Sequence, residues 1–207
     1  MAITLETLYY DFRSNYQDKP EYSINFYTDN ALFFNNLSSF KNIDALRMYI
    51  QITCRYVNAL FNKSRFNECI EACDKNLSII NNEILKLNIN EVRDDWYLAI
   101  LFADARSYYN LKDFKRSTAL FKSLLWYDPK NESYKNWLNY SKYRRISKYF
   151  NISAIIIPIC VLVEIFFKNP IPRVVMRSIF VVYFLIFITI LSYNYYLERT
   201  RRKKTKK

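Results

Sequence analysis

An apolar hairpin in the C-terminal third constrains this chain more than any other feature of its sequence. Its two arms run over 149–167 and 174–197, and a short connector with two prolines, Pro170 and Pro172, joins them. A helix over the 19 residues of the first arm would be about 28 Å long, close to the roughly 30 Å hydrocarbon core of a bilayer. The sequence therefore predicts a two-helix transmembrane hairpin over 149–197, with both of its ends on one side of the membrane.

Positive charge surrounds this hairpin unevenly. Residues 1–141 carry 17 basic and 17 acidic side chains, whereas residues 142–207 carry 14 and 2, so the whole surplus of 14 − 2 = +12 lies near the hairpin. Eleven of these basic residues flank the outer ends of the arms and three lie around the connector. Flanks rich in Lys and Arg stay on the cytoplasmic side of a membrane. We therefore expect the hairpin to lie in a bacterial inner membrane, with both termini in the cytoplasm.

The basic tail over 198–207 is expected to lie near anionic lipid headgroups. It has no aromatic residue on which bases could stack, so nucleic acid is not an expected partner. The N-terminus has neither a basic leader nor a long apolar core, and we expect no cleavable signal peptide. A reduced compartment and free structural thiols are predicted for the four cysteines, which form no C-x-x-C pair: Cys54, Cys69, Cys73 and Cys160.

The sequence contains no histidine and no glycine. Without histidine, the common zinc sites and the Ser/His/Asp and Cys/His catalytic groups are excluded. Without glycine, there is no glycine-rich loop for phosphate and no dinucleotide-binding fingerprint. We therefore expect a protein that is not an enzyme and that binds no cofactor or metal. The candidate carboxylates Asp94, Asp95 and Asp104 are interpreted as helix caps or solvated surface groups.

The chain before the hairpin shows helical periodicity. Residues 1–42, which are interrupted at Lys19-Pro20, predict an N-terminal cap of two short helices. From Asn42, a predicted N-cap, apolar residues at three-four spacing predict a helix as far as Leu60. The same spacing resumes over 66–87 and predicts a second, longer helix that keeps one apolar seam against a neighbour.

Two further helices are predicted over 96–111 and 114–125, and the dipeptide Asp128-Pro129 should stop the second. This segment, 98–129, resembles a tetratricopeptide repeat, in which two antiparallel helices form a hairpin. The residues that carry the resemblance are the small Ala105, the aromatic Tyr108, the helix opening Asp113-Phe114, the small Ser117, the aromatic Phe121 and the closing Asp128-Pro129.

A weaker copy of the repeat runs from Ile50 to Leu77 without the closing proline. The second helices of the two copies start 114 − 66 = 48 residues apart, against a family period of about 34. An overrun of the helix that begins at Phe66 would explain the difference. The resemblance implies an all-α fold of antiparallel helical-hairpin repeats over 43–148, of which residues 131–148 form a polar capping helix.

In this family the inner faces of the first helices line a groove that binds peptides. Mapped onto this chain, those faces present amides, a guanidinium and aromatic rings, which can hold an extended peptide. The groove residues implied in this way are Gln51, Asn58, Phe61, Asn62, Phe102, Arg106, Tyr109 and Asn110. The alternative is that these side chains form an ordinary polar face or lie under the N-terminal helices.

Within the hairpin, Glu164 is the only acidic residue, and it lies at a depth similar to that of Arg177 in the second arm. We expect these two residues to pair across the hairpin, since ionisable groups inside a membrane are rare and usually paired. The leading hypothesis is a membrane-anchored, non-enzymatic adaptor whose cytoplasmic repeat domain binds a protein or peptide partner. The alternative is a membrane-shaping or pore-type assembly, in which the hairpin forms a homo-oligomer.

Overall fold

The computed structural model describes residues 4–37, 39–87 and 94–147, together with Ser178, Val181, Val182 and Leu185. The chain divides into two compact units, 1–148 and 149–207. Every regular element in the described residues is helical, and no strand occurs among them. The prediction of an all-α fold is therefore confirmed for the part of the chain that the structure describes.

The N-terminal region forms three helices rather than the two that the sequence predicts. They are α1 (Leu5–Ser14), α2 (Pro20–Asp29) and α3 (Ala31–Asn36). Pro20 occupies the start of α2, where its fixed φ angle suits a helix and its missing N–H costs no hydrogen bond. The proline that interrupts the first helix therefore also begins the next.

The first long hairpin consists of α4 (Ile43–Asn62) and α5 (Phe66–Leu87). The predicted N-cap is confirmed, because the Oδ1 atom of Asn42 accepts a hydrogen bond of 2.9 Å from the backbone N–H of Ala45. The predicted seam of α4 is at most 1% exposed throughout: Leu46, Ile50, Thr53, Val57 and Leu60. In α5 the predicted seam is buried from Cys73 to Ile84 and ends there, since Leu87 is exposed.

The second hairpin consists of α6 (Asp95–Asn110) and α7 (Phe114–Tyr127), and a further helix spans 132–147. Asp94 caps α6 by accepting hydrogen bonds from the backbone N–H groups of Trp96 and Tyr97. The helix α7 ends directly before Asp128-Pro129, as predicted. Since α5 has 22 residues and α7 has 14, the second helix of the first hairpin is longer by 22 − 14 = 8 residues, which contributes to the wide spacing of the two hairpins.

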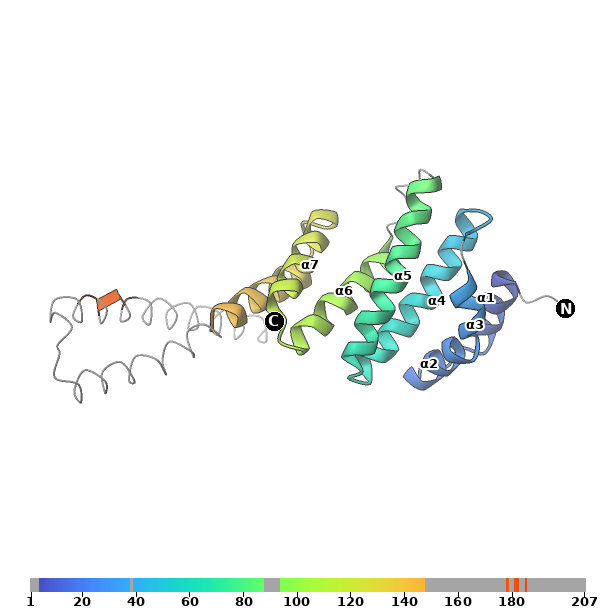
Figure 1. Ribbon diagram of the computed structural model, residues 1–207, viewed down its shortest axis with the longest axis horizontal. Helices are drawn as coiled ribbons and strands as arrows, with labels where there is room; N and C mark the ends of the chain where they lie inside the picture. The colour runs from blue at the N-terminus through green and yellow to red at the C-terminus, as the bar shows by residue number, and fades with distance from the viewer. Residues whose placement is uncertain are drawn as a thin grey trace, which may run out of the picture. The chain divides into compact units, whose positions relative to one another are not determined.

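The helices of this first unit pack side by side (Figure 1). The helix α4 contacts α1 and α2 on one side and α5 and α6 on the other, while α6 contacts α4, α5 and α7. The second helix of the first hairpin, α5, thus lies beside the first helix of the next, α6, as in stacked helical hairpins. The arrangement is that of a helical-repeat-like all-α fold.

The two hairpins share one turn geometry. Ser64 and Lys112, which are 112 − 64 = 48 residues apart, both have the left-handed φ angles of 58° and 64°. In each turn the left-handed N–H donates to the carbonyl three residues back, and the next N–H donates to the carbonyl five residues back, at 2.9 to 3.0 Å. This is the Schellman helix end, whose left-handed position usually holds glycine. A chain without glycine builds the same turn twice from Ser and Lys.

A polar network joins the N-terminal helices to the first hairpin inside the core. The Oδ1 atom of Asn76 in α5 accepts hydrogen bonds from the hydroxyls of Tyr27 in α2 and Tyr49 in α4. The Nδ2 group of Asn76 donates to the backbone oxygen of Ala72 at 2.6 Å. All three polar side chains are at least 90% buried, and the network satisfies their hydrogen-bonding groups.

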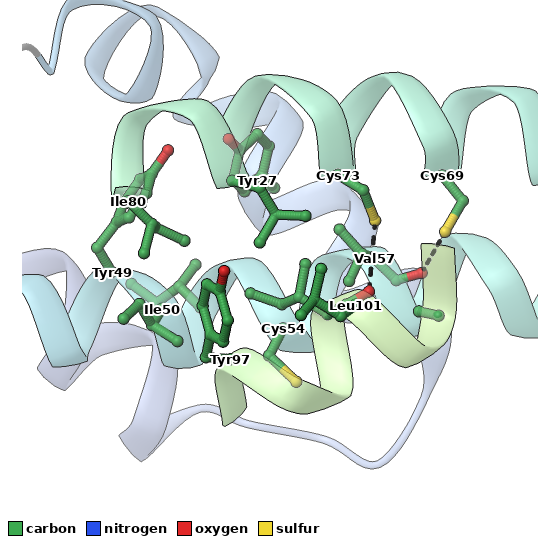
Figure 2. Close-up of a cluster of buried hydrophobic side chains, with 14 of the residues drawn as sticks. Tyr27, Tyr49, Ile50, Cys54, Val57, Cys69, Cys73, Ile80, Tyr97 and Leu101 are labelled. Atoms are coloured by element: carbon green, nitrogen blue, oxygen red, sulfur yellow. Dashed lines mark hydrogen bonds between the residues drawn. The ribbon is translucent and has the colours of Figure 1, made fainter. Parts of the chain in front are cut away.

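The cysteines of this unit are buried and free. The thiols of Cys69 and Cys73 donate to the backbone carbonyls of Val57 and Ile100 at 3.3 and 3.7 Å (Figure 2). These contacts fasten α5 to α4 and to α6. Burial raises the pKa of the Cys54 thiol to about 12, so this thiol stays protonated at neutral pH.

The predicted transmembrane hairpin over 149–197 lies outside the described residues except at four positions. No helix within the described ranges is both long and apolar enough to cross a membrane. The predicted pair Glu164 and Arg177, the thiol of Cys160 and the basic tail over 198–207 also fall outside the described residues. Val181, Val182 and Leu185 are helical, and each is more than half exposed.

Candidate functional site

An arginine surrounded by aromatic rings occupies the face where α4, α6 and the helix over 132–147 meet. The guanidinium carbon of Arg106 lies 3.9 Å from the ring centre of Phe61, 5.2 Å from that of Phe102 and 5.6 Å from that of Trp137. Burial lowers the pKa of Arg106, although a guanidinium remains charged at any physiological pH. Its Nε group is buried and has no hydrogen-bond partner among the described residues.

The rings around Arg106 also pack against each other. Trp137 contacts Tyr109 edge to face at 5.2 Å and stacks on Phe121 at 5.9 Å. The ring of Phe61 packs on that of Phe66 at 5.5 Å. Cation–π contacts to several packed rings hold the guanidinium in one place, so Arg106 is a pre-positioned charge rather than a mobile surface side chain.

The structure brings together only part of the predicted groove. Phe61, Phe102, Arg106 and Tyr109 belong to one cluster, through direct contacts and through Trp137. Gln51 lies apart and accepts a hydrogen bond of 2.7 Å from the hydroxyl of Tyr9 in α1.

The three predicted asparagines do not converge on that cluster either. Asn58 and Asn110 donate to backbone oxygens of their own helices at 2.8 Å, and Asn62 is exposed at the end of α4. The alternative that the N-terminal helices cover the face thus applies at Gln51.

A second hollow lies between α1, α4 and α6. This cavity has a volume of about 470 Å³, and four aromatic side chains line it: Tyr9, Phe12, Tyr16 and Trp96. The volume falls in the range of roughly 300 to 1,000 Å³ that is typical of ligand pockets, which combine apolar walls with a few placed polar groups. Here the polar groups are two guanidiniums and one amide, from Arg13, Arg55 and Gln51.

Arg55 is held rigidly in this pocket. Its guanidinium carbon lies 4.8 Å from the ring centre of Tyr16 and 5.0 Å from that of Trp96, and its Nη1 group donates to the Tyr16 hydroxyl at 3.0 Å. No carboxylate of the described residues forms an ion pair with Arg55 or Arg13. Three other arginines, at positions 47, 65 and 116, each pair with a carboxylate three residues away.

Asp104 is buried, which corrects the interpretation of this residue as a cap or a solvated group. It is 3% exposed in α6, and its Oδ1 atom has no hydrogen-bond partner in the described part of the chain. Burial, reinforced by the charge of Asp74, raises the pKa of Asp104 to about 7. Asp94 and Asp95 agree with the interpretation, because Asp94 caps α6 and Asp95 is exposed in its first turn.

Of the pocket residues only Gln51 was predicted, although Arg55 also carries a signal in the sequence. Arg55 follows Gln51 by four residues and precedes Asn58 by three, so helical spacing alone places it on the predicted face. Trp137, Tyr9 and Tyr16 carry no such signal, because only the packing of α1 and of the helix over 132–147 brings them to the site. No group of three or more Cys, Asp and Glu side chains within the described ranges could hold a metal ion.

Comparisons with models of protein families, with curated proteins and with solved structures find no match to this chain. Its class is defined instead by the fold and the two arginine sites. It is a helical-repeat-like all-α protein in which aromatic rings hold an arginine on the first helix of each hairpin, Arg55 on α4 and Arg106 on α6.

Proposed function

We propose that this protein is a membrane-anchored, non-enzymatic adaptor, in which a cytoplasmic domain of the tetratricopeptide type binds a peptide of a partner protein. The repeat assignment is supported by the identical turns 48 residues apart and by the motif positions of the second hairpin. Ala105, Ser117 and Phe121 have no exposed surface. The hydroxyls of Ser117 and Ser141 lie 2.7 Å apart, which requires α7 and the helix over 132–147 to approach closely.

The observation that carries the binding function is Arg106. The Arg106 guanidinium is half-buried among aromatic rings and has therefore lost part of its hydration. No carboxylate of the described residues forms an ion pair with it. Such a group gains from the carbonyl or carboxylate oxygens of a second molecule, while the rings around it supply apolar contact area. A peptide segment provides both kinds of group.

The membrane anchor is supported by the C-terminal sequence and by the residues that the structure describes there. Val181, Val182 and Leu185 are 58%, 56% and 58% exposed, and together with Ser178 they recur at the spacing of one helix face. Apolar side chains that are exposed on a helix, as Val181 and Val182 are, fit a surface covered by lipid or by another protein. Lipid is the simpler occupant, because the arms on either side of these positions are apolar over lengths that can span a bilayer.

Partner capture from gently solubilised membranes tests the adaptor function. The full-length chain is compared with Arg106→Gln and with Arg106→Ala. We expect partner recovery to fall about tenfold, as for the loss of a charged hydrogen bond at an interface. The matched control is Arg116→Gln, because Arg116 is exposed and lies in α7. Equal recovery of every partner by all variants would contradict the groove.

The exposed apolar face also favours a second candidate, a membrane-shaping or pore-type assembly through the hairpin. In that case the full-length chain should self-associate in membranes through 149–197, and loss of Arg106 should leave its activity unchanged. Cross-linking in native membranes separates the two candidates. Carbonate extraction is a test of both, because release of the intact chain from membranes would contradict any embedded hairpin.

A further inference from the structure

The pocket between α1, α4 and α6 carries positive charge on a rigid aromatic frame, and no carboxylate lines it. The nearest link to an acidic group is indirect, because the Tyr16 hydroxyl that accepts from Arg55 donates to Asp18 at 3.2 Å. Arg55 is sandwiched between the rings of Tyr16 and Trp96 and donates one hydrogen bond to the Tyr16 hydroxyl. The remaining N–H groups of a guanidinium form a planar fork that matches a carboxylate. Because the stacking already fixes this fork, little conformational entropy is lost when an anion binds.

The other polar groups of the pocket fit the same kind of ligand. Arg13, which is exposed in the last turn of α1, adds a second positive charge at the pocket, and no carboxylate lines the cavity. Gln51 is tied to Tyr9, which keeps its amide in a defined orientation. Tyr9, Phe12 and Trp96 leave an apolar wall beside the charges, and an aromatic or aliphatic side chain can pack there.

The C-terminal part of this chain has the wrong charge to occupy the pocket. Residues 142–207 hold 14 basic and 2 acidic side chains, so the basic tail is repelled by Arg13 and Arg55. An acidic segment of another protein has the complementary charge. From this we infer that the pocket is a binding site, separate from the Arg106 cluster, for an acidic side chain of a partner peptide together with its apolar or aromatic neighbour. The inference rests on the proposed adaptor function for the source of the peptide.

The three tryptophans of the chain allow a direct test. Trp96 lines the pocket, Trp137 belongs to the Arg106 cluster, and Trp126 is exposed on α7. The full-length chain is labelled with 5-fluorotryptophan, and its fluorine-19 signals are assigned with single Trp→Phe variants. The probes are acetyl-Phe-Glu-Phe-Glu-amide, the same peptide with Gln in place of Glu, and a short single-stranded oligouridine.

We expect the acidic peptide to shift the Trp96 signal and the Gln peptide to bind at least about tenfold more weakly, because charge-assisted hydrogen bonds are lost. Arg55→Gln should weaken the acidic peptide about tenfold or more, and Arg13→Gln, an exposed change that does not disturb the core, several-fold. Arg47→Gln, on the exposed face of α4, should leave the affinity unchanged. Added salt should weaken binding, since one charge is exposed.

The proposal is overturned if both peptides bind equally, if the Trp96 signal does not respond to the acidic peptide, or if Arg13→Gln and Arg55→Gln both bind like Arg47→Gln. A tighter response of Trp96 to oligouridine than to the acidic peptide would also overturn it in favour of nucleic acid. A response of Trp137 alone would reject the pocket while it supports the Arg106 groove. Failure of partner capture by the Arg106 variants leaves the Trp96 result unaffected, so the two hypotheses fail separately.

Discussion

The buried carboxyl group of Asp104 should make the stability of this protein depend on pH in an unusual direction. Most carboxylates in folded proteins are stabilised in their charged form, and their proteins lose stability in acid. Asp104 is 3% exposed and its Oδ1 atom has no partner among the described residues. Burial and the like charge of Asp74 disfavour its ionised form more than the charge of Arg116 favours it. The folded protein therefore favours the protonated form of Asp104.

The size of the effect follows from linkage between protonation and folding. The pKa of Asp104 rises from an ordinary 3.8 in the unfolded chain to about 7 in the folded protein. Between these values the folded state binds a proton that the unfolded state has released, so the free energy of unfolding falls as the pH rises. At about 1.4 kcal/mol per pKa unit, roughly three units amount to about 4 kcal/mol, lost between about pH 4 and pH 7 and constant above that.

The substitution Asp104→Asn removes the titrating group and keeps the shape of the neutral acid. We expect the variant to match the wild type within about 1 kcal/mol near pH 4 and to exceed its stability by about 2 to 4 kcal/mol near pH 8, after a cost for the extra buried amide hydrogens. Urea unfolding of the full-length chain, followed by far-ultraviolet circular dichroism at several pH values, measures the difference.

The control for this experiment is Asp29→Asn, because Asp29 is exposed at the end of α2. Its stability curve should run parallel to that of the wild type. Should the curves of Asp104→Asn and the wild type also run parallel from pH 4 to pH 8, the carboxyl group would be ionised or hydrated in the fold. The account of Asp104 given above would then be wrong.

Two further changes probe the core and the turns. Asn76→Leu leaves two buried tyrosine hydroxyls without their shared acceptor, so the free energy of unfolding should fall by about 2 to 4 kcal/mol, as measured by urea unfolding. Lys112→Gly replaces a left-handed residue by the one that adopts this conformation without steric cost, so thermal unfolding should show a gain of about 0.5 to 1 kcal/mol.

Each of these changes has a matched control on the surface of the same or the next helix. Asn82→Ala, at an exposed position of α5, should leave the stability within about 0.5 kcal/mol of the wild type. Lys122→Gly, at an exposed position in the middle of α7, should lower it by about 0.5 to 1 kcal/mol, since glycine is unfavourable in a helix interior. If Lys112→Gly were as destabilising as Lys122→Gly, the shared turn geometry would be incorrect.

The long helices could be predicted because their signals are local. Apolar spacing located α4 and much of α5, Asn42 and Asp94 act as caps, and Asp128-Pro129 ends α7. The short helix α2 was missed, because its apolar residues follow no regular period and its proline resembles a simple break. Local patterns of this kind depend on one face of one helix, and they fail where a helix is short.

The candidate sites, in contrast, could be predicted from the sequence only in part. The predicted groove, which the repeat resemblance placed on α4 and α6, includes two residues that are in contact, Phe61 and Arg106. Its binding role remains a prediction. The predicted groove did not include Trp137 or the pocket residues of α1, because no local pattern records which helix packs against the face. The tetratricopeptide-type assignment, the membrane anchor and the peptide partner remain predictions.

The sequence by itself determined where the long helices lie, which side of α4 faces a neighbour, and that the surplus charge gathers around an apolar C-terminal segment. These properties follow from the order of side chains along the chain, because helical spacing and net charge are set before the chain folds. Only the tertiary structure decided the burial of Asp104 and the fixed positions of Arg55 and Arg106. The helix α6 packs against α4, α5 and α7. A polar side chain of α6 that contact with a single helix would leave exposed to water is therefore buried.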